Sequence, residues 1–255
     1  MQATLIETDN EINYSPKEVV EQIKLAKWRE PPYKFQNWAN WLHRMSAYVG
    51  KIKPGMAHWI IKVASNKGDF VLDPFCGIGT VPLQADFLGR NGVGVDLNPY
   101  AYTIARAKFH RKSEKQQLQW LDSLEVDTTK IKLDNCSDFM KKFYHPETLK
   151  EILFVKNLIV KDKNHFLLGC LLGIIHGHRP GHLSATTSLV IPYNPKTEAE
   201  YREVIPRLKD KVKRMYKDGF ELKTSGKIYH ADSRKLPLKP NSVNLVISSP
   251  PYLIH

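Results

Sequence analysis

The chain has 255 residues, of which 42% are apolar and 25% are charged, so it can bury a core and is not a disordered polymer. Its 38 basic and 26 acidic residues give a formal net charge of +12, which favours polyanionic partners, nucleic acid first among them. Three cysteines without a C-x-x-C pair make neither a disulfide framework nor a zinc site. We expect no secretion signal, no membrane span and a cytoplasmic protein.

Two helices are predicted before the first strand. Ser15-Pro-Lys-Glu18 can form a capping box, which predicts a helix from there to about Trp28, buried on the side of Val19, Val20, Ile23 and Ala26. Pro54 opens the second helix, which runs to about Ser65. We expect residues 1–47, which contain the first of these helices, to form an N-terminal helical extension.

The next segment alternates strand and helix patterns. Gly68–Asp73 and Asn91–Asp96 are short runs rich in β-forming residues that each end in an acid, and we predict buried parallel strands there. Thr80–Leu88 and Asn98–Lys108 are predicted as the helices that follow them. This order predicts a right-handed parallel βαβ architecture.

The alternation stops after this segment and resumes near the end of the chain. Strand patterns return at Lys227–Asp232 and Ser242–Ser248. Residues 110–226 are therefore predicted as an insertion within one domain that is formed by residues 48–109 and 227–255. The insertion is mainly helical, with helices expected at Glu147–Val160, Asn164–Ile175 and Thr197–Lys217.

A glycine turn marks the candidate ligand site. Asp73-Pro-Phe-Cys-Gly-Ile-Gly-Thr80 stands where a strand gives way to a helix, and Gly77 and Gly79 let the backbone approach a ligand closely. Pro82 stands where the dinucleotide fingerprint has its third glycine, so the match to that fingerprint is poor. Asp96 ends the second strand and is placed to accept hydrogen bonds from a ribose diol. Together, the glycine turn and Asp96 favour an adenosine-type cofactor over a turn that binds no ligand.

These motifs and two later ones resemble a known enzyme family. The later motifs are His230-Ala-Asp-Ser-Arg-Lys-Leu-Pro-Leu238 and Asn241-Ser-Val-Asn-Leu-Val-Ile-Ser-Ser-Pro-Pro-Tyr252. In this order the four segments resemble the S-adenosylmethionine-dependent amino-methyltransferases of DNA, which methylate the exocyclic nitrogen of cytosine or adenine. Ser-Pro-Pro-Tyr is more similar to the cytosine-N4 branch, because the adenine branch usually has Asp or Asn before Pro-Pro-Tyr.

The resemblance implies a Rossmann-like methyltransferase sheet with S-adenosylmethionine as cofactor. It places Asp73, Phe75, Gly77 and Gly79 around the methionine end. It also places Asp96 on the ribose hydroxyls, Leu97 on the adenine ring and Asp232 at the adenine amino group, with Lys51 to Pro54 near the methionine carboxylate.

The resemblance also implies the catalytic turn, which is formed by Ser249, Pro250, Pro251 and Tyr252. An exocyclic amine is a poor nucleophile because its lone pair is delocalised into the ring. Acceptors at the Ser249 hydroxyl and the Pro250 carbonyl would localise that pair, and Pro251 would stiffen the turn. Tyr252 would stack on a base that has flipped out of double-stranded DNA.

Other reactive residues lead to different expectations. None of the three cysteines follows a proline, which disfavours carbon-5 cytosine methylation. The three histidines of His176–His182 have no cysteine or acid nearby, so we expect no metal and interpret this segment as a loop that faces nucleic acid. The basic run Arg207–Lys217 fits phosphate contact and an ordinary solvated helix face equally well.

We therefore expect a site-specific DNA methyltransferase of a restriction-modification system, acting on cytosine N4, with the insertion as a candidate target-recognition region. The alternatives are an adenine-N6 enzyme, a guanine-N2 methyltransferase of transfer RNA, and an inactive fragment or DNA-binding or cofactor-binding subunit of a split enzyme. The family continues past Pro-Pro-Tyr through further strands. We therefore expect an incomplete sheet with Val243–Ser248 as an uncovered edge, and a second polypeptide that completes the fold.

Overall fold

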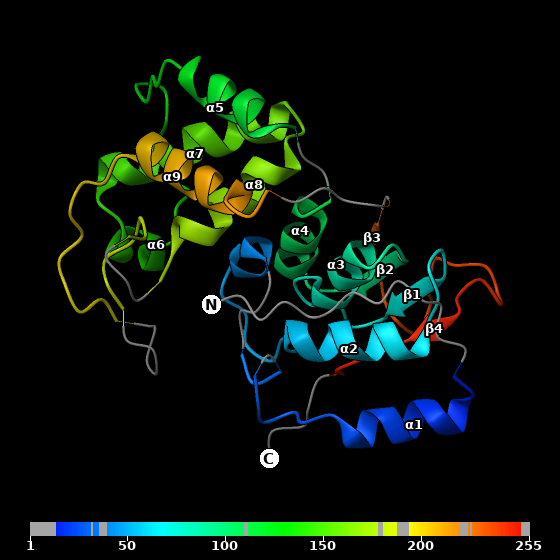
Figure 1. The fold of residues 1–255 in the computed structure, drawn as a ribbon. Helices are drawn as coiled ribbons and strands as arrows, with labels where there is room; N and C mark the ends of the chain where they lie inside the picture. Colours follow the sequence, from blue (N-terminus) through cyan, green and yellow to red (C-terminus); the bar gives the residue numbers. More distant parts are fainter. Residues whose placement is uncertain are drawn as a thin grey trace. The chain divides into compact units, whose positions relative to one another are not determined.

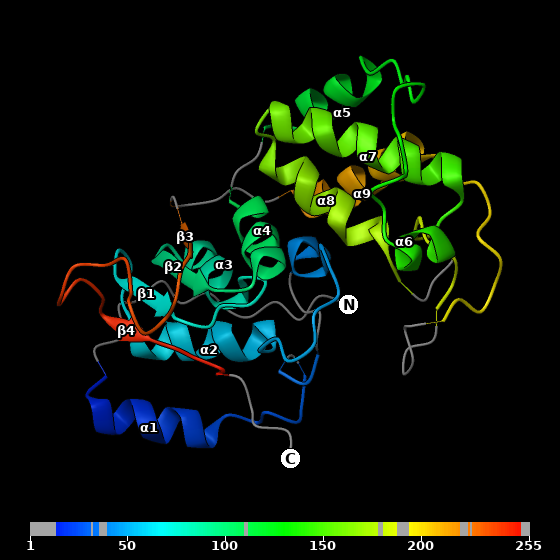
Figure 2. The ribbon, with the colours of Figure 1, turned by 180° about the vertical axis from the view of Figure 1, so that it is seen from behind.

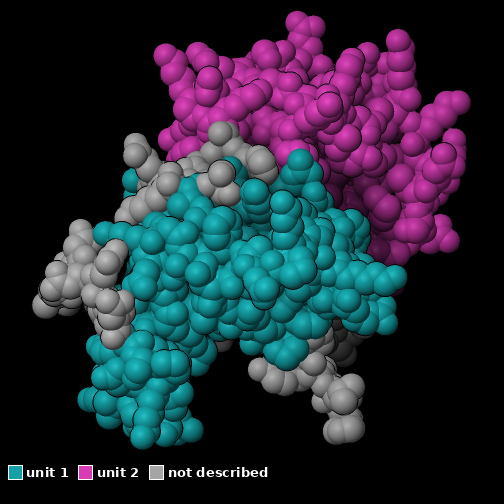
Figure 3. Space-filling view, turned by 90° about the vertical axis from the view of Figure 1, so that its right-hand side faces the viewer, with its two compact units in different colours: residues 1–109, 218–255 teal, residues 110–217 magenta. Residues whose placement is uncertain are grey.

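A computed structural model describes residues 14–31, 33–35, 40–109, 112–177, 181–187, 194–219, 224 and 226–250. The chain divides into two compact units, residues 1–109 with 218–255 and residues 110–217 (Figure 3). None of the helices in the described ranges is long and apolar enough to cross a membrane.

The first unit is built on a four-stranded parallel sheet. Its strands β1 (Phe70–Asp73), β2 (Asn91–Asp96), β3 (Lys227–His230) and β4 (Leu245–Val246) lie in the order β3-β2-β1-β4 (Figures 1 and 2). The chain moves outward from β1 to β3 and then returns to the other side of β1. Open parallel sheets bind ligands at the carboxyl ends of strands where the order reverses in this way. The expected Rossmann-like α/β fold is confirmed.

Three helices cover one face of this sheet. α2 (Pro54–Ala64) and α3 (Thr80–Phe87) share a buried apolar core with β1 and β4, and α4 (Pro99–Ala107) packs on β2 and β3. The opposite face carries the side chains of Leu72, Val93 and Val95, because neighbouring residues of a strand point to opposite sides. The shared core consists of Ala57, Ile61, Val71, Val81, Ala85 and Ile247.

The N-terminal helix α1 (Pro16–Leu25) begins as predicted and ends early. Ser15 and Glu18 form the capping box at its start. The indole N–H of Trp28 donates to the carbonyl of Ile23 at 3.1 Å and closes the helix before Trp28 is reached. The expected side is buried only in part, because Val19, Ile23 and Ala26 are half-buried and Val20 is exposed, and α1 packs along α2 (Figure 1).

The last strand is shorter than predicted. Asn241 has a φ of 56° in the turn before it, and the Ser242 hydroxyl donates to the carbonyl of Lys239, so Ser242 belongs to the turn. Pairing with β1 then covers only Leu245 and Val246 in place of Ser242–Ser248.

The second unit consists mainly of helices, as expected of the insertion. Helix α9 starts at Val204 and not at Thr197, because Pro206 lies in the first turn, where its missing N–H leaves no hydrogen bond unmade. The two short helices α5 and α6 were not predicted. The helices of this unit are α5 (Glu114–Asp122), α6 (Asp138–Phe143), α7 (Pro146–Lys161), α8 (His165–Ile175) and α9 (Val204–Tyr216).

Two glycines of β2 allow α3 to lie directly on the sheet. A Cβ atom at Gly92 would lie 2.2 Å from the carbonyl oxygen of Pro82, and one at Gly94 would lie 3.0 Å from Cγ of the same proline. Pro82 is the third residue of α3, where a proline is tolerated. In the dinucleotide fingerprint, the third glycine lies on the helix and allows helix and strand to approach closely. Here the glycines of the strand, Gly92 and Gly94, allow this approach.

This contact predicts a specific loss of stability. Gly92→Ala would push the new methyl group into the backbone of Pro82, and overpacking of this kind costs about 1–3 kcal/mol. We expect a lower urea midpoint of unfolding by circular dichroism. Gly181→Ala is the control, because no atom lies within 4 Å of the position of its Cβ. An unchanged midpoint for Gly92→Ala would show that α3 does not lie on β2 as described.

Candidate cofactor-binding site

The loop between β1 and α3 requires glycine at two positions. Gly77 and Gly79 have φ values of 51° and 75°, which L side chains rarely adopt. A Cβ at Gly79 would also lie 2.9 Å from Cβ of Ala105, and one at Gly77 would lie 3.1 Å from the ring of Tyr48. The loop backbone is therefore held tightly between α4 and the segment that precedes α2.

Asp96 joins this loop to the end of β2. Its Oδ2 accepts the N–H of Gly77 at 2.8 Å, and its Oδ1 accepts the N–H of Asn98 at 2.8 Å. Asn98 itself caps α4 by accepting from the N–H of Tyr100 at 2.9 Å, so Asp96 is not needed as the cap. Carboxylate oxygens have more than one lone pair, and both oxygens retain capacity for ribose hydroxyls.

Asp73 is a buried carboxyl group at the end of β1. Only 3% of the residue is exposed, and its Oδ1 accepts the N–H of Phe75 at 3.1 Å. Burial raises the pKa of Asp73 to about 7, helped by the charge of Asp96 and opposed by the hydrogen bond from Phe75. Phe75 is half-exposed beside it. The protonation state of Asp73 thus changes close to neutral pH.

Lys51 and Pro54 lie on the segment that leads into α2. The ammonium of Lys51 donates to the carbonyl of His43 at 3.0 Å, and His43 belongs to the short helix η1 (Trp41–Arg44). Burial, followed by the charge of Arg44, lowers the pKa of Lys51. Pro54 is the buried first residue of α2. Lys51 is thus half-buried in a cationic region that also contains Arg44 and Lys108.

The residues expected at the adenosine end lie on neighbouring strands. Asp96 pairs with His230 across β2 and β3, and Nε2 of His230 donates to the carbonyl of Leu97 at 3.0 Å. Leu97 is 65% exposed, as a surface for a flat ring requires. Asp232 follows β3 and accepts from Nε of Arg234 at Oδ1 and from Nη2 at Oδ2, and these hydrogen bonds lower the pKa of Asp232 to about 2.

Part of the predicted catalytic turn can be placed. The N–H of Ile247 donates to the carbonyl of Leu72 at 2.9 Å, which aligns the end of β4 with the end of β1. Ser249 follows two residues later, half-buried, and Pro250 is exposed. Pro251 and Tyr252 lie outside the described residues.

The loop has further features of a ligand site that the sequence did not reveal. The helix α3 has no side-chain cap, so its first N–H groups offer an anion site. The hydroxyl of Thr80, the first residue of α3, is buried and has no hydrogen-bond partner among the described residues. These donors, with the acceptor Asp96, fit a cofactor that carries a carboxylate and a ribose.

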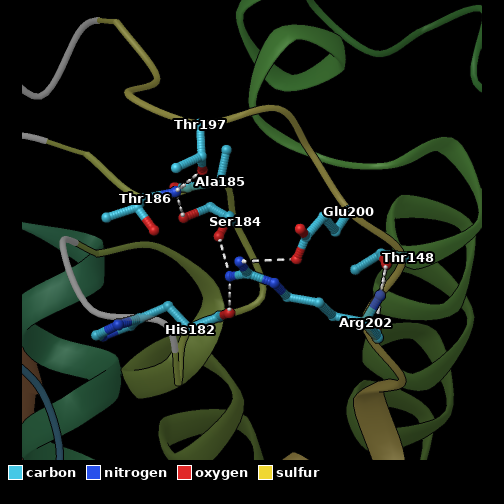
Figure 4. A network of polar contacts seen from close by, with 8 residues as sticks. All are labelled: Thr148, His182, Ser184, Ala185, Thr186, Thr197, Glu200 and Arg202. Carbon is cyan, nitrogen blue, oxygen red and sulfur yellow. Dashed lines mark hydrogen bonds and ion pairs between the residues drawn. The ribbon is translucent and has the colours of Figure 1, made fainter.

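The two ends of the segment His176–His182 are held by packing and by Arg202, and residues 178–180, with the second of its three histidines, lie outside the described ranges. His176 packs against the ring of Phe143 with centroids 5.0 Å apart, and burial lowers the pKa of His176. Nη1 of the buried Arg202 donates to the carbonyls of His182 at 2.7 Å and Ser184 at 2.5 Å (Figure 4). Within the described ranges, no three His, Cys, Asp or Glu residues are grouped as a metal site.

The basic run on α9 is divided between structural and exposed residues. Lys209 pairs with Asp122, and Lys211 is buried. Lys213 and Arg214 are exposed, so only part of the run is available for phosphate contact. That contact stays a prediction.

Comparisons with known proteins agree with the fold. Residues 7–107 match a family model described as DNA methylase, of the N6/N4 type. The Type II methyltransferase M.MjaII of Methanocaldococcus jannaschii is 31% identical over 128 residues, which are 50% of this chain and 22% of that protein. The Type II methyltransferase M.BsoBI of Geobacillus stearothermophilus is 28% identical over 125 residues, 48% of this chain and 24% of that protein.

One of the relatives is named as an enzyme that acts on transfer RNA. The tRNA (guanine(10)-N2)-dimethyltransferase of Methanothermobacter thermautotrophicus is 36% identical over 52 residues, 20% of this chain and 16% of that protein. No solved structure matches the chain. The aligned part of this chain spans only about a quarter of the length of the two Type II enzymes. Over residues 7–107 the chain is thus similar to DNA methylases of the N6/N4 type.

Proposed function

We propose that this protein transfers a methyl group from S-adenosylmethionine to the exocyclic N4 of cytosine in DNA, as the modification enzyme of a restriction-modification system. The observation that carries the proposal is the hydrogen bond between Asp96 and Gly77, because it combines the glycine loop and a ribose acceptor at one edge of the sheet. The Type II methyltransferases among the relatives support DNA as the substrate.

The proposed roles follow the positions of the residues along the edge of the sheet. Asp73, Phe75, Gly77 and Gly79 surround the methionine end of the cofactor, and Lys51 and Pro54 lie near its carboxylate. Asp96 binds the ribose, Leu97 packs on the adenine, and Asp232 accepts from its amino group. Bound S-adenosylmethionine supplies an electrophilic methyl group.

The chemical step depends on the turn after β4. Ser249 and Pro250 accept the hydrogens of the target amine, Pro251 stiffens the turn and Tyr252 stacks on the flipped base. Ser249 follows the strand next to Asp73, so the amine and the cofactor meet between β1 and β4. Positioning of the two reactants is the main source of rate.

Target recognition is assigned to the insertion, residues 110–226, and its exposed basic residues on α9 contact phosphate. A guanine-N2 methyltransferase of transfer RNA is the second candidate, favoured by the match to the archaeal dimethyltransferase. Adenine N6 is the alternative target in DNA. The need for a second polypeptide stays a prediction.

Cofactor binding gives the first test of the proposal. We expect calorimetric titration to show S-adenosylmethionine binding by the wild-type chain, weakened about 10-fold or more by Asp96→Ala, because a charge-assisted acceptor is lost. The exposed Asp134→Ala is the control and should bind normally. Equal affinity of Asp96→Ala and the wild type would refute the ribose assignment.

The buried carboxyl group predicts a pH dependence. Because the cofactor carries positive charge, it favours ionised Asp73, whose pKa of about 7 means that a proton must be released on binding below that pH. Affinity should therefore fall as the pH drops below 7, by up to about 10-fold per unit. Asp73→Asn should bind more weakly above pH 7 and lose this acid decline. An acid decline that persists in Asp73→Asn would assign it to another group.

The product identifies the branch of the family. After incubation of unmethylated DNA with the protein and S-adenosylmethionine, mass spectrometry of the digested DNA should show N4-methylcytosine. Ser249→Ala should reduce its formation about 100-fold, as the loss of one polar contact to a reacting group commonly does. Ser242→Ala, in the turn before β4, is the control. Methyladenine, or methylguanosine in transfer RNA, would instead support the alternatives.

A further inference from the structure

A lysine lies completely buried behind the glycine loop. Lys108 follows the last residue of α4, and none of its surface is exposed. Its ammonium group donates a hydrogen bond to the carbonyl oxygen of Ile78. Burial of an ammonium group is costly unless its charge and its hydrogen-bonding capacity are used. The burial of this ammonium group therefore indicates that its charge has a structural or functional role.

The partner of Lys108 is the central residue of the loop. Ile78 stands between Gly77 and Gly79, the two residues with positive φ, whose backbones have the greatest conformational freedom. On one side Asp96 holds the N–H of Gly77, and on the other Lys108 holds the carbonyl of Ile78. A carboxylate from the end of β2 and an ammonium from the end of α4 thus fix two neighbouring residues.

We propose that Lys108 is a positioning residue of the cofactor site, which fixes the Ile78 carbonyl and thereby the direction in which the loop backbone faces S-adenosylmethionine. The inference rests on the proposed function. Lys108 acts through Ile78 and the loop, while the residues named above contact the cofactor. Because the loop is built from glycines, its bound conformation is set by these anchors and not by its own φ preferences.

The surroundings of Lys108 make this anchor sensitive to pH. Among the described residues, the titratable groups that face it are His43 of η1, Lys51 before α2 and Cys76 of the loop. Burial, and then the charge of Lys51, lower the pKa of Lys108 to about 7, and Cys76 opposes this shift. Below that pH the group is an ammonium and a strong donor. Above it the neutral amine binds the Ile78 carbonyl more weakly.

The test measures S-adenosylmethionine binding by calorimetry below and above pH 7. We expect Lys108→Met to lower the affinity about 10-fold at neutral pH, because the anchor of the carbonyl is lost. The wild type should lose affinity as the pH rises above 7. Lys108→Arg should keep its affinity there, because a guanidinium stays charged. The exposed Lys67→Met is the control and should match the wild type.

The outcomes separate this inference from the proposed function. If the wild type binds and Lys108→Met binds equally well, or Lys108→Arg keeps the alkaline decline of the wild type, the role of Lys108 is wrong. If the wild type itself does not bind, the proposed function fails, and this inference with it. Circular dichroism of each variant shows whether it folds. Should the arginine not fold, proton uptake on binding to the wild type above pH 7, measured in two buffers, decides the question, and no uptake would overturn the role.

Discussion

The hydrogen bond from the N–H of Gly77 to Asp96 connects the two βα units on which the site is built. A second bond, from the N–H of Cys76 to the carbonyl of Val95 at 3.0 Å, lies beside it. Together they hold the loop after β1 against the end of β2, next to the point where the strand order reverses. The same carboxylate therefore holds the shape of the loop, and in the proposed function it also binds the ribose of the cofactor.

In this chain α3 packs closely on the sheet, as the helix of the dinucleotide fingerprint does, although its sequence differs from that fingerprint. Pro82 occupies the position of the third glycine of the fingerprint, so the helix cannot supply the close contact with the sheet. Gly92 and Gly94 supply it from β2, where any side chain would meet the proline or its neighbours. This packing keeps the N-terminus of α3 at the strand ends. In the proposed function, its uncapped N–H groups face the cofactor there.

Local patterns predicted most of the sheet unit, and tertiary contacts account for what was missed. The strand Asn91–Asp96 and the Asn98 cap depend on neighbouring residues, and both are found as expected. The end of α1 depends on the Trp28 indole, and the short β4 depends on pairing with β1, neither of which a local pattern contains. The burial of Lys108 could not be predicted from the sequence, because it depends on the loop that folds over this side chain. The roles of Ser249 and Asp232 come from family resemblance and stay predictions.

In the proposed function, the loop from Phe75 to Val81 and the turn after Asp96 form one cofactor site. Hydrogen-exchange mass spectrometry with and without S-adenosylmethionine tests it directly, because bound ligand slows the opening of the backbone that it contacts. We expect slower exchange in both segments and unchanged exchange in α5 to α9 of the second unit. Protection confined to the second unit, or binding without protection of the glycine loop, would contradict it.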